Sequence, residues 1–446
     1  MVADTMFVAF DDTDSTEFMC TTFLATEVID AMREYDLIGL PRLVRLNPAV
    51  PWKTRGNAAV ALRFGRGKGQ AALAGMIRDT PVYCYQKMIE PAPAGEALDR
   101  CSFLLDKWSR VKEDASPGLV VTEKRPSPRL YWRAVRDIVE KEDVIKEIER
   151  IGAKRYELAG GRGVIGATAA LSWRPRDRTF EVIAYRSRDR WGRPRHLTDA
   201  SVLEMDRKFT STFNNFDQCE GRRAISPHTP CPVLFGIRGD DPYVLPSAML
   251  SLDSEPIDRW LLYLTNQGTD DHIIHNWTSL VPDRSYDVQA TVVEGPRTIR
   301  GGHVVIGTLT DRGHHRLEMT AYEPSKDFRE VIRQLQVGDR IRAYGELRRS
   351  PRTLNIEKLE IVALVHAYEK VSNPVCGTCG KRMQSMGTAG GYRCKKCRLK
   401  APESAAERRK IERKIATGWY EPPVCARRHL SKPLKRCQTE HDRITL

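Results

Sequence analysis

Residues 6–35 read MFVAFDDTDSTEFMCTTFLATEVIDAMREY, and this stretch decides which fold to expect for the first part of the chain. The apolar run 6–10 predicts a short strand, and apolar residues recur at helical spacing over 21–35. A group of acidic residues separates these two elements. The pattern therefore predicts a strand, an acidic loop and a helix.

The same mixture of strands and helices continues to about residue 160. Two further strands are predicted at 41–48 and 57–65, and helices are predicted at 69–79, 95–110 and 142–152. We therefore expect a mixed α/β catalytic domain over residues 1–160.

Residues 161–279 again combine both kinds of element. Helices are predicted at 164–173 and 199–209, and strands at 179–187, 231–239 and 259–266. An α+β domain of ferredoxin-like type fits this order, so the chain as a whole is expected to be a multidomain α+β protein.

Residues 280–366 have a different pattern, made of many short strands. Five strands are predicted, with a short helix at 328–335 after the third, and they span residues 286–296, 303–311, 316–323, 339–348 and 353–364. Five strands with a helix between the third and the fourth is the order of an OB-fold barrel.

Residues 367–446 contain two close cysteine pairs, Cys376-x-x-Cys379 and Cys394-x-x-Cys397. This spacing brings four thiolates to the corners of a tetrahedron, which suits Zn²⁺. Four protein ligands close the site, so the predicted role is structural rather than catalytic. A basic helix is predicted at 405–418, followed by an irregular tail, and the whole region is expected to be a zinc ribbon with a basic C-terminal tail.

The positive charge of the chain is concentrated in this last region. The formal net charge is +14, and residues 366–446 hold 19 Lys and Arg against 7 Asp and Glu. Such an excess is typical of a surface that binds a polyanion, although charge alone does not distinguish RNA, DNA and acidic membranes. A solvated tail is the alternative.

Other features bear on the compartment. No apolar run approaches the roughly 20 residues that a membrane span needs. Acidic residues stand near the start, where a signal peptide would have basic ones. The seven cysteines outside the two pairs are scattered, as ordinary thiols are in a reducing compartment. We therefore expect a cytoplasmic protein without a membrane segment.

The acidic loop after the first predicted strand is the strongest catalytic candidate. Asp11, Asp12 and Asp14 place three carboxylates within four residues, and Mg²⁺ with a bound phosphate would relieve their repulsion. Thr21 and Thr22 stand at the predicted helix start, where backbone N–H groups favour phosphate. A solvated acidic turn and simple helix capping are the alternatives.

A second candidate is the loop from Asn47 to Asn57, which contains PWKTRGN. Lys53 and Arg55 could hold phosphates, and Gly56 allows a close backbone approach. A basic surface loop is the alternative. The GRGVIG segment at 161–166 formally matches a dinucleotide fingerprint, but without a convincing βαβ unit it is better interpreted as an anion site at a helix start.

Two polar segments complete the set of candidates. The run 266–272, NQGTDDH, follows an apolar strand and is interpreted as an active-site loop or a plain turn. The tail mixes aromatic, proline and arginine residues, which could stack on and clamp unpaired bases; a tail that wraps its own domains is the alternative. The tail candidates are Trp419, Tyr420, Arg427, Arg428, His429 and Lys432.

Several blocks together resemble one family, the archaeal tRNA-Ile 2-agmatinylcytidine synthetases. They occur in the family's order over nearly the whole chain: AFDDTDS…MCTT, RLNPAVPWKTRGNAAVAL, ELAGGRGVIGA, SPHTPCPVLFGIRG, TNQGTDDH and YEPP…ARRHLSKP. The AFDDTDS and KTRGN blocks are the most specific. The resemblance implies a kinase-like domain, a ferredoxin-like domain, an OB-fold and a zinc ribbon.

The resemblance also implies an activity. The enzyme would attach agmatine to the wobble cytidine of the isoleucine tRNA with a CAU anticodon, using ATP and Mg²⁺ to phosphorylate the 2-carbonyl oxygen of the base. Asp11, Asp12 and Asp14 would hold Mg²⁺ and ATP, and Thr21 would be autophosphorylated. Further ATP or phosphate contacts would come from Ser15, Thr22, Lys53, Arg55, Gly56 and Asn57.

Agmatine's guanidinium requires a carboxylate partner, for which Asp270 or Asp271 is nominated.

Two other functional classes compete with this interpretation. A non-enzymatic single-strand-binding protein would combine an OB barrel with a zinc ribbon but would not need the first 280 residues. A nucleotide-dependent ligase acting on DNA is disfavoured because the chain has no K-x-D-G motif.

Overall fold

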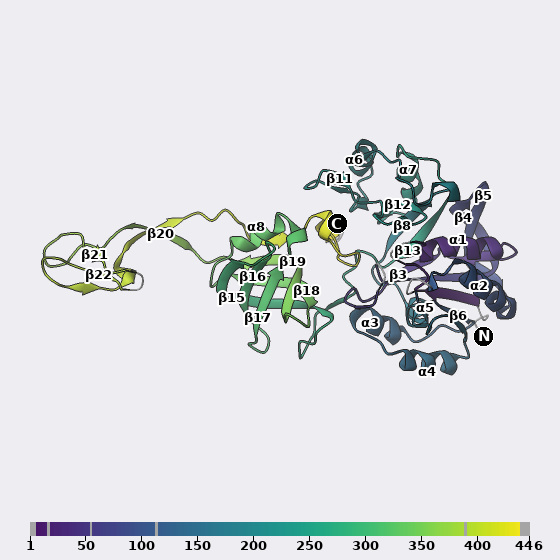
Figure 1. Cartoon of the computed structure of the whole chain (residues 1–446), viewed down its shortest axis with the longest axis horizontal. Coiled ribbons are helices and arrows are strands. Elements are labelled where there is room, and N and C mark those ends of the chain that lie inside the picture. The colour runs from purple at the N-terminus through teal and green to yellow at the C-terminus, as the bar shows by residue number, and fades with distance from the viewer. Residues whose placement is uncertain (1–5, 16–17, 54–55, 112–114, 388–389, 438–446) are drawn as a thin grey trace.

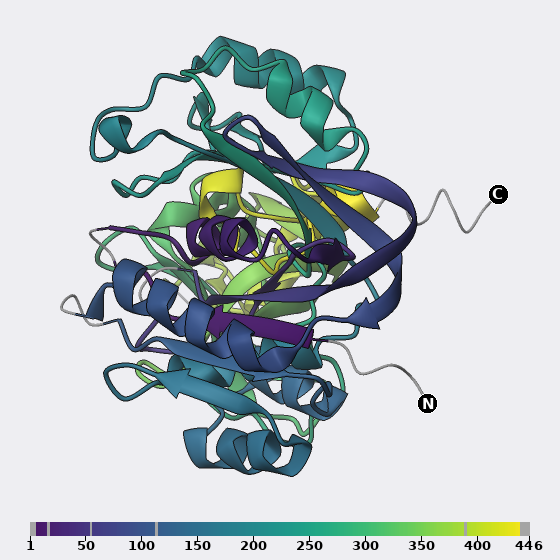
Figure 2. The ribbon, with the colours of Figure 1, turned by 90° about the vertical axis from the view of Figure 1, so that its right-hand side faces the viewer.

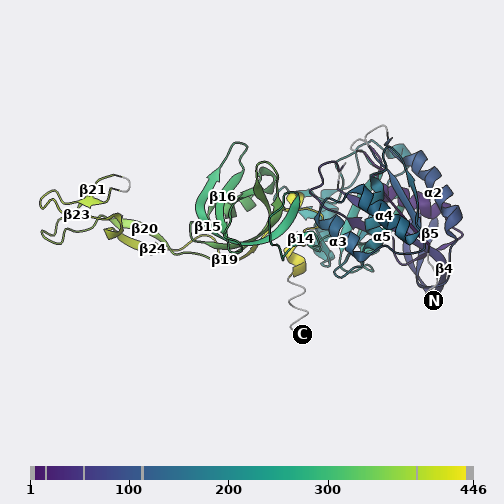
Figure 3. The same ribbon diagram turned by 90° about the horizontal axis from the view of Figure 1, so that it is seen from below.

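The structure is a computed structural model that describes residues 6–15, 18–53, 56–111, 115–387 and 390–437. The molecule is elongated, with a broad α/β body at one end, a β-barrel in the middle and a small cysteine-bearing tip at the other end (Figure 1). Figure 3 shows the same three parts from below. None of the helices in the described part of the chain has the length and apolar character that a membrane span requires.

The body is built on one 11-stranded sheet. Its path is β7-β6-β1-β4-β3-β13-β8-β12-β9, and β2 and β5 pair with β4 and with each other. The strands are β1 (Met6–Asp11), β2 (Asp36–Ile38), β3 (Arg42–Arg45), β4 (Ala58–Ile77), β5 (Thr80–Pro91), β6 (Gly118–Thr122), β7 (Lys154–Glu157), β8 (Thr179–Tyr185), β9 (Thr212–Phe213), β12 (Val233–Gly239) and β13 (Arg259–Thr265).

Strand β1 lies inside this sheet and is buried on both faces. Because side chains alternate along a strand, Met6, Val8 and Phe10 pack into one core with two helices, and Phe7 and Ala9 pack into a second core with three others. The first pair is α1 (Thr21–Ala31) and α2 (Ala94–Trp108); the second group is α3 (Pro128–Arg136), α4 (Lys141–Ile151) and α5 (Gly163–Ser172).

Strands from both sides of residue 160 belong to the same sheet. Strand β13 runs parallel to β3 and antiparallel to β8, so the predicted boundary does not interrupt the hydrogen-bonded ladder. Helices α6 (Asp199–Lys208) and α7 (Leu245–Leu250) pack with β8 and β12 in a further core. A short hairpin, β10 (Phe216–Asp217) and β11 (Arg222–Arg223), lies between them in sequence.

The helix predicted at 69–79 is wrong, because these residues belong to strand β4 and the turn after it. Strands β4 and β5 form a long hairpin that curves along one side of the body (Figure 2). The end of β4 also pairs with β13, where a Cβ on Gly75 would lie 2.3 Å from the carbonyl oxygen of Trp260. Pairing with β5 and β13 supplies partners for the backbone N–H and C=O groups of this segment. These contacts outweigh the helix propensity of its alanines.

The barrel has the strand and helix order predicted for residues 280–366. The order is β15-β16-β17-β19-β18, and pairing of β15 with β18 closes it. Helix α8 (Phe328–Arg333) lies between the third and fourth strands; the strands are β15 (Arg284–Thr298), β16 (Val304–Thr310), β17 (Arg316–Ala321), β18 (Arg340–Leu347) and β19 (Thr353–Ala363). The short β14 (Ile273–Ile274) pairs with β15.

The tip holds the four paired cysteines on a small three-stranded sheet of β21 (Gln384–Ser385), β22 (Tyr392–Arg393) and β23 (Lys400–Ala401). The predicted basic helix at 405–418 is wrong. Residues of this segment form β24 (Glu407–Ile411), which pairs antiparallel with β20 (Ala367–Ser372). The chain enters the tip through β20 and leaves it through β24. The backbone of this segment therefore forms hydrogen bonds with a neighbouring strand and not within a helix.

The tail returns from the tip to the body. Strand β25 (Gly418–Tyr420) adds to β19 of the barrel, and the following residues lie between the barrel and the body (Figure 1). The C-terminal segment therefore contacts parts of the protein that lie far from it in sequence.

Candidate functional site

A cavity of about 530 Å³ lies where the end of β1, the starts of α1 and α5, and the returning tail meet. It brings together ten of the candidate residues that the sequence suggested, although they come from separate segments of the chain. Those lining it are Asp11, Asp12, Asp14, Thr21, Thr22, Lys53, Gly56, Asn57, Arg427 and His429.

The acidic loop forms one wall of the cavity. Asp11 ends β1, and its Oδ1 accepts a hydrogen bond of 2.7 Å from the backbone N–H of Asp12. Burial raises the pKa of Asp11 well above its usual range, and the charges of Asp12 and Asp14 raise it further. Closely spaced carboxylates that resist ionisation together form an oxygen donor set that fits a divalent cation such as Mg²⁺.

Helix α5 lies directly against this wall. A Cβ on Gly166 would be 1.8 Å from Asp11 Oδ2, and one on Gly163 would be 2.4 Å from the Asp11 carbonyl oxygen. Gly163 and Gly166 therefore allow helix α5 to approach strand β1 closely. Arg162 of the same segment, which the sequence analysis did not nominate, forms an ion pair of 3.1 Å with Asp12.

The two candidate threonines begin α1. The hydroxyl of Thr13 donates to that of Thr21 over 3.1 Å, whereas the hydroxyl of Thr22 lies 3.1 Å from the sulfur of Cys20. Both threonines line the cavity. Ser15 does not line it, because its hydroxyl accepts from the backbone N–H of Phe18 at 2.9 Å and caps the loop.

The lining also includes arginines that the sequence analysis missed. Arg45 donates from Nη1 to the carbonyl of Gly56 at 2.5 Å, and Arg238 lies 3.1 Å from Glu181. All four of these residues line the cavity. Arg45 stands two positions before the Asn47–Asn57 loop, and Arg238 lies in the FGIRG block, so their proximity to nominated segments was the available signal.

The basic loop contributes Lys53, Gly56 and Asn57, whereas Arg55 lies outside the described residues. The Lys53 ammonium donates to the carbonyl of Pro48, and burial followed by the charge of Arg428 lowers its pKa. Asn57 donates to the carbonyl of Asn47 at 3.0 Å, which closes the base of the loop.

The tail supplies four residues to the cavity wall, Val424, Cys425, Arg427 and His429. The charge of Arg45, together with burial, holds the pKa of His429 well below its usual range, so its ring is neutral at pH 7. Arg427 forms an ion pair of 2.9 Å with Glu421. Arg428 is bound by Glu346 and, at 3.2 Å, by Glu357 of the barrel.

The remaining tail candidates pack against the protein itself. Trp419 lies edge-on to Tyr344 of the barrel, with ring centroids 5.3 Å apart, and the hydroxyl of Tyr420 donates to the carbonyl of Ala416 at 2.9 Å. Lys432 binds Asp177 at 3.0 Å. The structure thus places the tail around its own domains.

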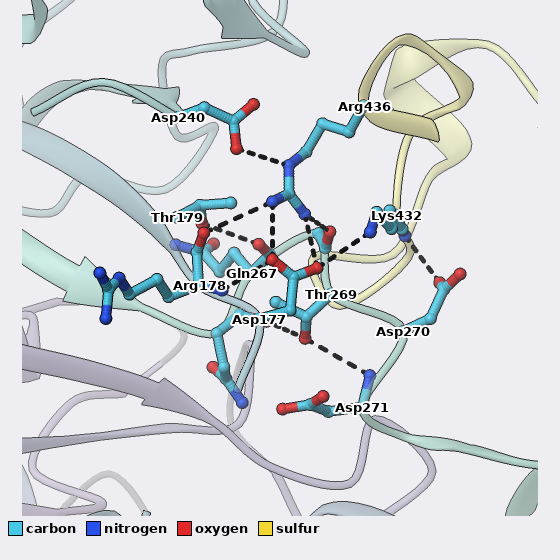
Figure 4. Close-up of polar contacts among 12 residues, drawn as sticks. Asp177, Arg178, Thr179, Asp240, Gln267, Thr269, Asp270, Asp271, Lys432 and Arg436 are labelled. Atoms are coloured by element: carbon cyan, nitrogen blue, oxygen red, sulfur yellow. Dashed lines mark hydrogen bonds and ion pairs between the residues drawn. The ribbon is translucent and has the colours of Figure 1, made fainter. Parts of the chain in front are cut away.

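Asp270 and Asp271 lie in the polar network shown in Figure 4, outside the cavity. Asp270 accepts from Lys358 at 2.8 Å and from the backbone N–H of Lys432 at 2.7 Å. Asp271 accepts a hydrogen bond of 2.5 Å from the Tyr131 hydroxyl. Both carboxylates therefore have protein partners.

The four paired cysteines converge at the tip, as predicted. The sulfur atoms of Cys376, Cys379, Cys394 and Cys397 all lie within 4.8 Å of one another. Four thiols at this separation match the tetrahedral ligand set of Zn²⁺.

Family models match three segments of the chain. Residues 7–160 match the TiaS TCKD domain, 161–272 the TiaS FLD domain and 373–415 the TiaS C-terminal zinc ribbon domain. The tip is therefore a zinc ribbon, and the overall class is multidomain α+β with a closed five-stranded barrel.

Full-length relatives and solved structures agree with these matches. The tRNA-Ile 2-agmatinylcytidine synthetase TiaS of Archaeoglobus fulgidus is 37% identical over 98% of both chains, and that of Methanocaldococcus jannaschii is 37% identical over 96% of this chain and 98% of the relative. The crystal structure of TiaS in complex with its isoleucine tRNA and ATP superposes with a TM-score of 0.83 at 36% identity, and a complex of TiaS with the tRNA, AMPCPP and agmatine superposes with 0.81 at 33%, each over 97% of both chains. This chain belongs to the TiaS family of tRNA-Ile 2-agmatinylcytidine synthetases.

Proposed function

We propose that this protein joins agmatine to the 2-position of the wobble cytidine in the CAU-anticodon isoleucine tRNA, in a reaction that consumes ATP. The observation that carries the proposal is that an acidic loop, two threonines and several arginines meet in one cavity, in a chain that matches synthetases of this activity over nearly its whole length. A non-enzymatic nucleic-acid-binding protein has no need of such a site.

The chemistry requires activation of a poor leaving group. One phosphoryl group of ATP is transferred to the 2-carbonyl oxygen of the base, and the other is released to water as phosphate, which leaves AMP. Agmatine's amine then forms the new C–N bond, loses a proton, and displaces the phosphate. We propose that Asp11, Asp12 and Asp14 hold Mg²⁺ with the nucleotide, while nearby arginines stabilise the phosphate charge. Arg45, Arg162 and Arg238 are placed to do so.

Of the two threonines, we propose Thr21 as the residue that becomes phosphorylated. Its hydroxyl is hydrogen-bonded to Thr13 in the acidic loop, which orients it toward the carboxylate side of the cavity. The Thr22 hydroxyl is engaged with Cys20. Lys53, Gly56 and Asn57 complete the proposed phosphate contacts, with Arg55 beside them in sequence.

Agmatine's guanidinium needs a carboxylate. To bind agmatine, Asp270 would have to lose its hydrogen bond from Lys358, and Asp271 its hydrogen bond from Tyr131. Glu181, which lines the cavity, is the alternative. The variants Asp270→Asn, Asp271→Asn and Glu181→Gln separate the three candidates: the carboxylate that binds agmatine is the one whose loss raises the KM for agmatine while leaving the KM for ATP near wild type.

We also propose a role for each of the four parts of the chain. Residues 1–160 would act as the kinase-like domain, 161–279 as a ferredoxin-like domain, 280–366 as an OB-fold and 367–446 as the ribbon and tail, in a cytoplasmic protein. The four cysteines would hold Zn²⁺. RNA contacts are proposed for Trp419, Tyr420, Arg427, Arg428, His429 and Lys432.

One experiment tests the activity directly. The protein is incubated with ATP, agmatine and the CAU-anticodon tRNA, the RNA is digested, and the nucleosides are weighed by mass spectrometry. We expect one cytidine per tRNA to gain the mass of agmatine less water. ATP turnover or RNA binding without this product would refute the proposal.

A further inference from the structure

The ring of His429, in the tail, lies against the basic loop of the body. It lines the large cavity and also a smaller neighbouring cavity of about 280 Å³, and Arg45, Lys53 and Gly56 line both cavities as well. A Cβ on Gly56 would lie 3.2 Å from both Cδ2 and Nε2 of His429. The ring is therefore packed against the backbone of the loop that contains Gly56.

Two backbone hydrogen bonds fix the position of His429. The N–H of Gly268 donates to the carbonyl of His429 over 2.8 Å, and the N–H of Asp270 donates to the carbonyl of Leu430 over 2.9 Å. Both donors belong to the polar run 266–272 that follows β13. Because these bonds are made by the backbone, they leave the imidazole ring available to the cavity.

The fold does not use either nitrogen of this ring. Within the part of the chain that the structure describes, no group forms a hydrogen bond or an ion pair with Nδ1 or Nε2 of His429. The side chain is reached through the cavity, although protein surrounds it. Since buried polar atoms are normally hydrogen-bonded by the protein, a ring whose nitrogens face a cavity is placed to exchange a proton with the molecule that fills it.

The charged groups around the ring keep it neutral. The charge of Arg45 on β3, followed by burial and the charge of Arg238 on β12, holds the pKa of His429 well below its usual range. Arg238 itself pairs with Glu181 on β8 at 3.1 Å. A neutral imidazole has one nitrogen that accepts a proton, so His429 can act as a base at pH 7.

The second step of the proposed reaction needs such a base. When the amine nitrogen of agmatine bonds to C2 of the phosphorylated cytidine, it uses its lone pair and becomes positively charged. One of its N–H bonds then breaks, and the C2–O bond breaks with its electron pair leaving on the phosphate. The nitrogen is acidic once its lone pair is bonded to an electron-poor carbon, so a base with a pKa below neutrality can take the proton.

Other acceptors in the cavity are already occupied. The two oxygens of Glu181 accept from Arg238 at 3.1 Å and from Gln267 at 2.5 Å. Asp217 accepts the backbone N–H groups of Cys219, Glu220 and Cys425. The three carboxylates of the acidic loop are proposed to hold Mg²⁺.

We propose that His429 is the general base of the agmatine-attachment step, which takes the proton from the attacking nitrogen on its ring and returns it to water. The inference rests on the proposed function and deepens it. Gly56, which contacts the ring, accepts a hydrogen bond of 2.5 Å from Arg45, one of the arginines proposed to hold the phosphate. The carbon that the amine attacks is one bond from the oxygen that bears this phosphate, so a base beside these groups lies close to the attacking nitrogen.

The test separates the two steps of the reaction. His429→Ala removes the ring, whereas His429→Gln keeps a side chain that hydrogen-bonds but does not take up a proton. His228→Gln is the matched control, because His228 is the other histidine among the described residues that line the cavity. Each protein is mixed with the CAU-anticodon tRNA and ATP labelled in its β- and γ-phosphates. Phosphorylation of the RNA is measured without agmatine, and formation of the C–N bond is measured in a single turnover with saturating agmatine.

Both His429 variants should attach agmatine about 10²-fold to 10⁴-fold more slowly than the wild type, which is the usual contribution of a general base. Phosphorylation of the RNA should fall far less, because the carbonyl oxygen has no proton to lose, and phosphorylated tRNA should accumulate. Added imidazole should restore agmatine attachment by His429→Ala at least tenfold, since it can enter the space that the ring leaves. The wild type and His429→Gln should not respond to imidazole, and His228→Gln should behave as the wild type.

Agmatine attachment by His429→Gln at the wild-type rate overturns the proposal, whether or not His429→Ala folds. An equal loss in both steps also overturns it, and would make His429 a binding or packing residue. A loss in His228→Gln that imidazole restores would transfer the role to His228. Failure of the proposed function is a separate outcome, because the wild-type protein itself would then form neither phosphorylated RNA nor the agmatine adduct.

Discussion

At the scale of single residues, the cavity is lined by two kinds of candidate. Some can be recognised in the sequence from their residue type and spacing, and others are candidates only because the fold places them at the cavity. Asp12 belongs to the first kind, since it stands in an acidic cluster after a strand. Arg162 belongs to the second, since an isolated arginine in a glycine segment has no distinctive spacing. Their ion pair of 3.1 Å joins the acidic loop to the start of α5.

Replacing Asp12 with alanine should abolish both tRNA modification and ATP turnover while the protein stays folded. The change removes one carboxylate from the proposed cation site and leaves Arg162 without its partner. Product mass and phosphate release measure the two activities, and circular dichroism checks the fold. ATP turnover near the wild-type rate would exclude this loop from the mechanism.

The adjacent threonines can be separated by a pair of matched variants. Thr21→Val should lose any autophosphorylation, whereas Thr22→Val should keep it, because only Thr21 is hydrogen-bonded to the acidic loop. Phosphopeptide mass spectrometry after incubation with ATP reads the modified position. A phosphate found on Thr22 alone would reverse the assignment.

At the scale of elements, the start of α5 and the zinc ribbon show how local structure serves the site. Helix α5 approaches β1 so closely that Gly166 has no room for a side chain beside Asp11. The ribbon, by contrast, is a small element at the far end of the molecule, with a core made of few side chains.

Gly166→Ala should therefore impair catalysis by displacing Asp11, because the added Cβ would lie 1.8 Å from its Oδ2. We expect ATP turnover to fall at least tenfold and the melting temperature to drop by a few degrees, as overpacking typically costs about 1–3 kcal/mol. Gly95→Ala in α2 is the control, since nothing lies within 4 Å of its new methyl group. Equal behaviour of the two variants would contradict the close approach.

Replacing Cys394 and Cys397 with serine should release one zinc per chain and weaken tRNA binding. Each serine removes a thiolate ligand, and a small zinc domain generally unfolds without its metal. Basal ATP hydrolysis by the body should be largely retained, because the ribbon lies at the other end of the molecule. Metal analysis that still finds a full equivalent of zinc would rule out the site; Cys219→Ser, outside the ribbon, should keep it.

At the scale of the whole molecule, the tail holds the barrel and the body together. It adds β25 to the barrel, contributes His429 to the cavity, and inserts Arg436 between Asp177 and Asp240 of the body (Figure 4). The cavity is thus completed by residues that lie far beyond the acidic loop in sequence.

Deleting the residues after Thr417 should accordingly abolish catalysis even at saturating tRNA, and should lower stability. The deletion removes Arg436, whose ion pairs with Asp177 and Asp240 hold the tail against the body. Affinity for tRNA should fall as well, but the salt slope should change by less than the number of lost basic residues suggests. A truncated protein with wild-type kcat and melting temperature would show that the tail is dispensable.

The sequence by itself determined the local parts of this protein. Apolar spacing located β1, α1, α2 and the five barrel strands, and the cysteine pairs located the zinc ribbon, because these signals depend on neighbours within a few residues. Local signals failed at 69–79 and at the basic segment 405–418, where strands from elsewhere supply the backbone partners.

Only the tertiary structure decided which of these parts meet. Arg45, Arg162, Arg238 and Glu181 reach the cavity because the sheet and α5 bring distant segments together, and no spacing in the sequence encodes that meeting. The same holds for the tail, whose basic residues suggested RNA binding, although several of them are paired with carboxylates of the tail itself, the barrel and the body. Charge is a property of composition, whereas the partner that neutralises it is fixed by packing across the whole chain.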